Sequence, residues 1–149
     1  MKLTNSLVAL LASASIAGCS TSSSHDASLP LAATRNNAGQ IANVSLASVG
    51  DKTDFDFYIS GVPDGTTLPL RIYTFVHKGS CQQPGPVAYA MNDKVNTESD
   101  AGTRGWTFYR SAPVAMQELL SGKYALVVRT APEDGNLDIF CGDIAQATH

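Results

Sequence analysis

Asp54-Phe55-Asp56-Phe57-Tyr58-Ile59 is the stretch that decides the fold class, because the residues at 54, 56 and 58 alternate with apolar residues at 55, 57 and 59. A period of two is typical of a β-strand with one face buried and the other in solvent. The next segment, Val62 to Thr66, has Pro63 and Gly65 at positions that tight turns favour. The sequence therefore predicts a half-buried strand followed by a reversal of the chain.

Further apolar stretches of strand length follow this one. They are Leu68–Val76, Val87–Met91, Trp106–Tyr109, Tyr124–Val128 and Leu137–Cys141. Leu68–Val76 has apolar residues on both faces, which predicts a central strand, and the polar stretch Asn92–Gly105 predicts a loop or a sheet edge. Val114–Leu120 predicts one or two helical turns, and no stretch of the sequence has the pattern of a long amphipathic helix. About seven to eight short strands predict an all-β, antiparallel β-sandwich.

The N-terminus has the order of a bacterial signal peptide: Lys2, then an apolar run Leu7–Ala12, then small residues. The twelve uncharged residues from Leu7 to Gly18 are fewer than the roughly 20 that cross a bilayer as a helix. Ile16-Ala17-Gly18-Cys19 resembles the lipobox of bacterial lipoproteins. We therefore expect residues 1–18 to be removed and Cys19 to carry lipid; the alternative is an ordinary secretory signal with a chance cysteine.

Residues 19–39 are predicted to form a lipidated flexible tether, because this serine-rich segment offers little to bury and no sustained period. The residue after Cys19 is Ser20, and not the Asp that retains many lipoproteins at the inner membrane of Gram-negative cells. We therefore expect the outer membrane as the location, with the periplasmic face and the cell surface both left open. The β-sandwich domain is expected at residues 40–149.

The charge balance argues against a nucleic-acid partner. The chain has 10 Lys and Arg against 13 Asp and Glu. Loss of Lys2 with residues 1–18 leaves 9 against 13, a net charge of −4. No basic run is present, and this mild acidity fits a soluble domain without indicating a particular partner.

The cysteines predict one disulfide. With Cys19 committed to lipid, Cys81 and Cys141 remain as an even pair in an oxidising compartment. A bond between them would stabilise the fold by on the order of 4 kcal/mol through loop closure. Two buried free thiols are one alternative. Metal binding is another, although neither cysteine has a second ligand at the spacing of a metal motif.

Two regions carry a family resemblance. Thr74–Cys81 with Pro84-Gly85-Pro86-Val87, and Leu120–Thr130 with Phe140–Ile144, resemble parts of copper/zinc superoxide dismutases. The same pieces are similar to the chordin-type repeat domain. Either resemblance implies a Greek-key, immunoglobulin-like or superoxide dismutase-like sandwich, and the first implies the same disulfide between the two cysteines.

The chemistry of the dismutases does not carry over. At the His-x-His position this chain has Phe75 and His77, and at the late-strand His position it has Arg129. Asp138 lies near the position of the family's cationic Arg, and residues 81–106 contain no His. Copper and zinc of this type need several neutral imidazoles. We therefore expect no dismutase activity, no enzymatic activity of another kind and no cofactor.

His77 is interpreted as a strand-end imidazole bonded to backbone or water, with a metal site shared with Met91 or Met116 as the weaker alternative. Six aromatic residues are interpreted as core, with a carbohydrate- or peptide-binding face as the alternative: Tyr73, Phe75, Tyr89, Trp106, Phe108 and Tyr109. Four arginines are interpreted as solvated surface cations, with pairing to acidic loops or an anionic ligand as the alternative: Arg71, Arg104, Arg110 and Arg129.

Together these patterns predict a non-enzymatic envelope lipoprotein. The membrane is expected to hold it through the N-terminal lipid, and the sandwich is expected to meet an envelope or host protein. Two alternatives remain: a periplasmic copper- or zinc-binding module on a dismutase-like scaffold, and an inhibitor of host hydrolases.

Overall fold

The computed structural model describes Gly18, residues 26–99, Gly102 and residues 104–149. The predicted lipidation site Cys19 and the predicted signal peptide, apart from Gly18, lie outside these described residues. None of the helices among them is long and apolar enough to cross a membrane.

Nine strands and four short helical segments form the described chain. The strands are β1 (Ala27–Ala33), β2 (Ala42–Val49), β3 (Lys52–Ile59), β4 (Ile72–Gly79), β5 (Pro84–Ala90), β6 (Glu98–Ser99), β7 (Trp106–Ala112), β8 (Tyr124–Thr130) and β9 (Asp138–Asp143). The helical segments are η1 (Arg35–Asn37), α1 (Met116–Ser121), η2 (Pro132–Asp134) and η3 (Ile144–Gln146). The all-β, antiparallel prediction is confirmed, with one strand more than expected in the two-residue β6.

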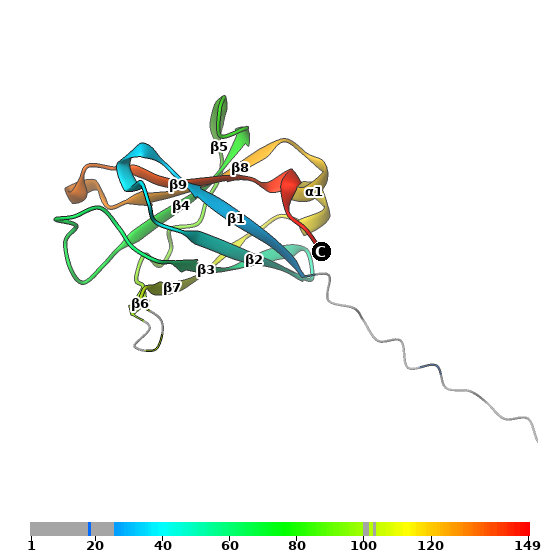
Figure 1. Ribbon diagram of the computed structural model, residues 1–149. Helices are drawn as coiled ribbons and strands as arrows, with labels where there is room; N and C mark the ends of the chain where they lie inside the picture. Colours follow the sequence, from blue (N-terminus) through cyan, green and yellow to red (C-terminus); the bar gives the residue numbers. More distant parts are fainter. Residues whose placement is uncertain (1–17, 19–25, 100–101, 103) are drawn as a thin grey trace, which may run out of the picture.

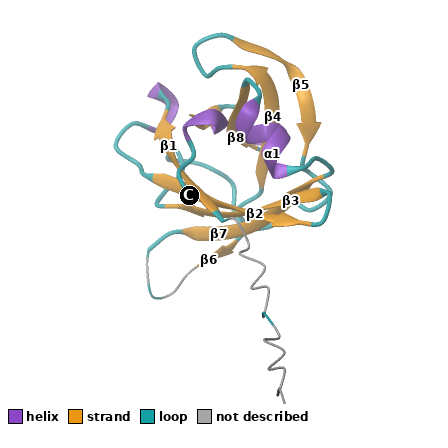
Figure 2. Cartoon of the chain, turned by 90° about the vertical axis from the view of Figure 1, so that its right-hand side faces the viewer, coloured by secondary structure: helices purple, strands orange, loops and turns teal. Residues whose placement is uncertain are grey.

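The strands form one curled sheet in the order β5-β4-β8-β9-β1-β2-β3-β7-β6. Strand β1 joins its two halves, because Ala27–Leu31 pair with β2 whereas Ala32 and Ala33 pair with β9. We call the half with β2, β3, β7 and β6 layer A, and the half with β9, β8, β4 and β5 layer B. Figure 1 shows the two layers facing each other, and Figure 2 shows α1 at one end between them.

The connections between the layers give the Greek-key arrangement. The chain passes from β3 in layer A to β4 in layer B, and later from β7 to β8. Strand β3 pairs with β7, and β4 pairs with β8, both antiparallel. Each layer therefore combines strands that are distant in sequence.

The core lies between the layers and follows from the period of two. In β3, Phe55, Phe57 and Ile59 are fully buried, whereas the intervening Asp54 and Asp56 are exposed. Phe57 stacks on Phe108 of β7 with ring centroids 4.8 Å apart. The alternation at residues 54–59 therefore places one face of β3 in the core, as predicted.

Strand β1 corrects the prediction of a tether over residues 19–39. Leu29 is 1 % exposed, and Ala27 and Leu31 are also buried in the core. These residues occupy every second position of β1, a short period of two that directly follows the serine-rich segment. The following turn is also ordered, because buried Asn37 donates from Nδ2 to the carbonyl of Gly61 at 3.0 Å. Residues 27–39 therefore belong to the folded domain.

Two further boundaries differ from the prediction. Strand β4 begins at Ile72 and not at Leu68, which is 69 % exposed and lies outside the strand. The predicted loop or edge over residues 92–105 contains the short edge strand β6. Helix α1 begins two residues after the start of the predicted helical turns and ends one residue after their end.

The two ends of the sandwich differ. The start of β1, the C-terminus and α1 lie at one end, and the loops around residues 34–40, 60–70 and 131–137 gather at the other (Figure 1). At the first end, Ser28 and Thr148 exchange two backbone hydrogen bonds of 2.8 and 2.9 Å. The start and the finish of the described domain are thus held together at the end where the chain enters from Cys19.

Candidate functional site

A pocket of about 240 Å³ lies where the loop between β4 and β5 covers the outer face of layer B. It is lined by Thr34, His77, Cys81, Pro84, Gly85, Val127, Arg129, Asp138 and Cys141. Strand β4 turns Ile72, Thr74 and Val76 into the core, so the alternation places Phe75 and His77 on the outer face. We refer to this site as the hairpin pocket.

The disulfide fixes one wall of the hairpin pocket. Cys81 and Cys141 are bonded, with Cα atoms 5.9 Å apart and a sequence separation of 60. The backbone N–H of Cys81 also donates to Oδ1 of Asp143 at 2.8 Å. The predicted pairing is therefore confirmed, and it ties the β4–β5 loop to β9.

His77 is bonded to the same loop. Its Nδ1 lies 3.0 Å from the carbonyl oxygen of Gly85, and because a carbonyl only accepts, Nδ1 must carry the proton. The Nε2 atom is buried and has no hydrogen-bond partner among the described residues. This contact agrees with the interpretation of His77 as a backbone-bonded imidazole.

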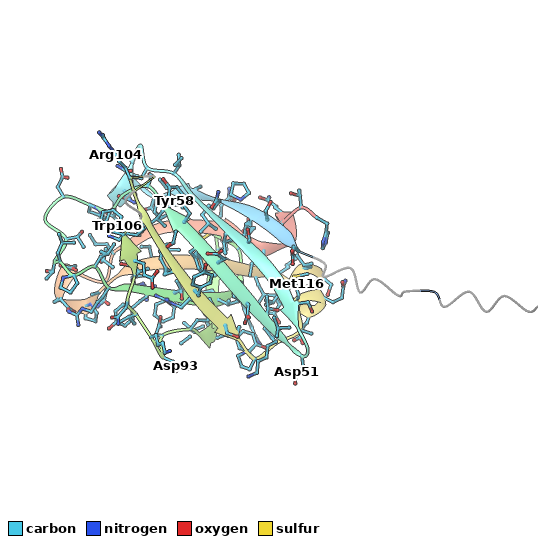
Figure 3. All side chains as sticks on the ribbon, turned by 90° about the horizontal axis from the view of Figure 1, so that it is seen from below. Asp51, Tyr58, Asp93, Arg104, Trp106 and Met116 are labelled. Carbon is cyan, nitrogen blue, oxygen red and sulfur yellow. A yellow bond between two sulfur atoms is a disulfide. The ribbon has the colours of Figure 1, made fainter. Side chains whose placement is uncertain are left out.

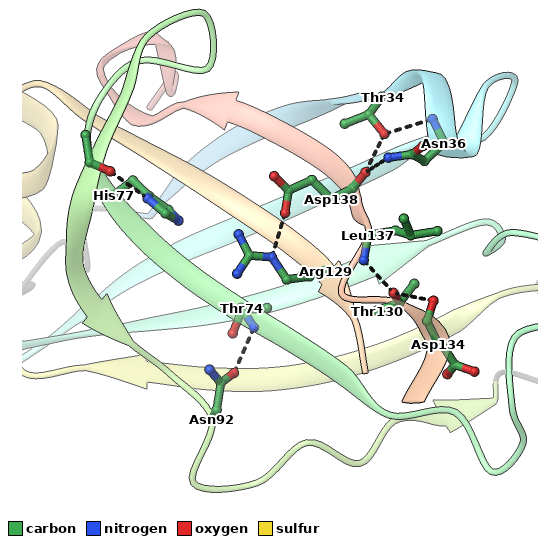
Figure 4. Close-up of polar contacts among 11 residues, drawn as sticks. Thr34, Asn36, Thr74, His77, Asn92, Arg129, Thr130, Asp134, Leu137 and Asp138 are labelled. Carbon is green, nitrogen blue, oxygen red and sulfur yellow. Dashed lines mark hydrogen bonds and ion pairs between the residues drawn. The ribbon is translucent and has the colours of Figure 1, made fainter. Parts of the chain in front are cut away.

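Arg129 is held by two neighbours on the outer face of layer B. Its Nε donates to Oδ1 of Asp138 at 2.6 Å, and its guanidinium carbon lies 4.6 Å from the ring centroid of Phe75. Figure 4 shows this ion pair beside His77 on the neighbouring strand. Phe75, His77 and Arg129, compared above with dismutase ligands, and Asp138, compared with the family's cationic Arg, thus share one face, where Arg129 is paired with Asp138.

The metal-site alternative is not supported by proximity. Met91 is part of the core, whereas His77 lies on the outer face of layer B. Met116 lies on α1 and lines a different pocket with Ser48 and His149. Within the described residues, no group of three or more His, Cys, Asp or Glu side chains is placed to hold a metal ion.

The six aromatic residues do not form a single binding face. Phe108 is buried in the core, and Tyr89 and Trp106 pack against it. Tyr109 is 70 % exposed and lies on the outer face of layer A, while Tyr73 and Phe75 lie on the opposite side of the domain. The interpretation as core holds for three of them, and the other three are divided between two surfaces.

The arginines have different surroundings, and the surface interpretation is wrong for Arg110. Arg71 forms an ion pair with Glu133 of η2, and Arg104 is exposed. Arg110 is only 7 % exposed. Its position follows from the alternation in β7, where Phe108 and Ala112 also point inward. The period of two over residues 108–112 is present in the sequence, and in the structure it outweighs the usual preference of a charged side chain for the surface.

Arg110 is a buried cation without a carboxylate. Its Nη1 donates to the carbonyl of Tyr109 at 2.7 Å and its Nη2 to the carbonyl of Ile72 at 2.9 Å. Its Nε is buried without a partner, and no Asp or Glu of the described residues forms an ion pair with it. Burial lowers the pKa of Arg110 to about 10, so the guanidinium is still charged at neutral pH.

A second pocket of about 320 Å³ lies beside this arginine. It is lined by Asp54, Met91, Asp93, Lys94, Tyr109, Arg110 and Ser111. In Figure 3, Trp106 marks the start of β7, and Asp93 lies on the segment between β5 and β6. We refer to this site as the edge groove.

The chain matches no protein-family model, no curated protein and no solved structure. No relative therefore indicates a role for the hairpin pocket or the edge groove.

Proposed function

We propose that this protein is a non-enzymatic lipoprotein of the bacterial outer membrane, which presents its sandwich to a protein partner in the envelope. One observation carries the proposal: a disulfide-bonded domain begins at Ala27, directly after the lipobox-like Ile16-Ala17-Gly18-Cys19. An anchor followed so closely by a stable β-domain suits display at a membrane surface.

The corrected start of the domain limits its reach. Only residues 20–26 separate Cys19 from β1. Seven residues extend at most about 25 Å, so the end with the start of β1, α1 and the C-terminus would face the membrane. The loops around residues 34–40, 60–70 and 131–137 would then face away from it.

The polar groups of the hairpin pocket support a binding role over a catalytic one. The Nδ1 proton of His77 is bonded to Gly85, and Arg129 is bonded to Asp138. A general base or nucleophile needs a reactive atom that is free to meet substrate. Nδ1 of His77 and the guanidinium of Arg129 are thus used by the fold, and the Nε2 atom of His77 that has no partner among the described residues is buried.

Two experiments test this proposal. Cells that express the full chain are labelled with an alkyne fatty acid, and we expect label in the wild type and none in Cys19→Ala. Photo-crosslinking side chains are then introduced at exposed Leu68, Val87 and Tyr109 in intact cells. A defined protein adduct at one of these positions supports the proposal; an unlabelled chain, or no adduct at any of them, contradicts it.

A further inference from the structure

Strand β7 has an open edge over most of its length. On this side β6 pairs only with Trp106 and Thr107, so the described chain places no strand against Phe108 to Ala112. An unpaired edge presents backbone donors and acceptors that can pair with another strand. The edge groove lies along the same residues, at Tyr109, Arg110 and Ser111.

The hydrogen-bond pattern identifies which backbone groups face this edge. The N–H of Ser60 donates to the carbonyl of Ile41 at 2.9 Å, and the two residues follow the β2–β3 register. In an antiparallel ladder, alternate residues bond to opposite neighbours. Even-numbered residues of β3 therefore bond to β2, and odd-numbered residues such as Phe55 bond to β7.

The same alternation continues into β7. Phe55 lies opposite Arg110, so Arg110 bonds to β3, and the backbone groups of Tyr109 and Ser111 point to the open edge. The contact from Nη1 of Arg110 to the carbonyl of Tyr109 agrees with this assignment. The N–H of Tyr109 and both backbone groups of Ser111 face the edge groove.

Arg110 supplies the charge that would select a partner. In an added strand, the residue opposite Arg110 would lie on the same face of the sheet as its guanidinium, in the gap between the layers. A carboxylate there could accept a hydrogen bond from the unpartnered Nε of Arg110 and neutralise the buried cation. A buried charge without a partner is costly. Besides Arg110, the groove is lined by one positive side chain, Lys94, and two negative ones, Asp54 and Asp93.

We propose that the open edge of β7 binds an extended peptide segment of a partner protein, which pairs with Tyr109 and Ser111 and places an acidic side chain opposite Arg110. This inference rests on the proposed function and names the kind of partner it requires. The mode is β-strand addition, in which backbone hydrogen bonds give affinity and alternate side chains give specificity.

The test uses the full chain purified in mild detergent and two synthetic peptides, acetyl-Val-Thr-Glu-Thr-Val-amide and the same peptide with Gln in place of Glu. In this register the central residue lies opposite Arg110 and the terminal valines face the core. We expect the Glu peptide to bind about tenfold more tightly and to slow amide exchange at Tyr109 and Ser111. Equal binding of the two peptides, or no binding at millimolar concentration, would overturn the proposal.

Three variants separate the contributions. Ser111→Pro removes the outward N–H, which an edge strand tolerates, and should abolish binding, while Ser111→Ala keeps the N–H and should bind as the wild type does. Arg110→Met should bind both peptides equally. Val87→Ala on the opposite edge strand β5 is the matched control for surface changes. Binding that is unaffected by Ser111→Pro would overturn the proposal.

A second copy of the chain is the other occupant that could pair with this edge. Sedimentation without peptide would then show a dimer that Ser111→Pro dissolves, and this result would also overturn the peptide proposal. Failure here is distinguishable from failure of the proposed function. If Ser111→Pro gives the same crosslinked partners as the wild type, the proposed function is supported, but the partner binds a surface other than the edge of β7.

Discussion

Nη2 of Arg110 donates a hydrogen bond of 2.9 Å to the carbonyl of Ile72, and this contact joins β7 of layer A to β4 of layer B. The two strands belong to different layers of the sandwich. The guanidinium also lies over the ring of Phe108, with its carbon 4.8 Å from the ring centroid. Arg110 therefore links the two layers, although burial of its positive charge is unfavourable.

Substitution of Arg110 should separate packing from charge. Arg110→Ala should lower the free energy of unfolding by about 2–4 kcal/mol, because it opens a cavity beside Phe108 and leaves the Ile72 carbonyl unbonded. Arg110→Met fills most of the volume and removes a buried charge, so its loss should be smaller. Urea unfolding of both variants measures the difference, and equal losses would contradict this account.

Leu29 tests whether β1 is part of the core. Leu29→Ala should lower the free energy of unfolding by about 2–5 kcal/mol, because the side chain is fully enclosed between the layers. Ser28→Ala, on the exposed face of the same strand, should change it by less than about 0.5 kcal/mol. If thermal and urea unfolding show no difference between these two variants, residues 27–33 do not contribute to the core.

The Cys81–Cys141 bond should account for a large part of the stability. It links residues 60 apart in sequence, and loop-closure entropy gives such a bond on the order of 4 kcal/mol. The double variant Cys81→Ala/Cys141→Ala should lose about this amount in urea unfolding. Wild type unfolded with and without a dithiol reductant provides the control, and equal midpoints in the two conditions would refute the prediction.

Asp56 should make stability depend on pH. Partial burial raises its pKa above the usual 3.8, against a smaller opposite effect of the hydrogen bond from Tyr109. An acid whose pKa is higher in the folded state loses stability as pH rises from its unfolded pKa through its folded pKa. Asp56→Asn should therefore gain stability relative to wild type between about pH 3 and pH 7.

Asp54→Asn is the control for Asp56→Asn, because it removes one charge from the same exposed face of β3. Urea unfolding of both variants and the wild type is compared at the two pH values. A difference between Asp56→Asn and wild type that stays constant with pH would speak against the raised pKa.

Metal titration addresses the alternative function. We expect calorimetric titration of the full chain with Cu(II) and Zn(II) to give the same result for wild type and His77→Ala, because the described residues place no group of three or more His, Cys, Asp or Glu side chains to hold a metal ion and Arg129 lines the same pocket as His77. Tight binding that His77→Ala abolishes would restore a metal-handling role.

Much of the fold could be read from local patterns. Residues 54–59 alternate because one face of β3 is buried, and the pairing of Cys81 with Cys141 follows from an even number of thiols after Cys19. Hydrophobic period and composition are properties of a few neighbouring residues, so they can be recognised in the sequence alone. Residues 27–33 show the limit, since a short alternation of small and apolar residues becomes a strand only when β2 and β9 lie on either side of it.

The candidate sites were less accessible to sequence reasoning. His77 could be placed at a strand end, but its bond to Gly85 depends on how the β4–β5 loop folds back. The period of two places Arg110 at an inward position of β7. A charged side chain at such a position is nevertheless expected at the surface unless the groups that bond to it are known. The edge groove combines β7 with Met91, Asp93 and Lys94 from another part of the chain.

The sequence by itself predicted six of the strands, the turn at residues 62–66 and the single disulfide, because period, turn residues and cysteine number are local or countable properties. Only the tertiary structure decided that β1 closes the sandwich, that Arg110 lies in the core and that β7 ends layer A with an open edge. Each of these depends on pairing between segments distant in sequence, such as β3 with β7 and Arg110 with Ile72. Such pairings are selected by the burial and hydrogen bonding of the whole chain.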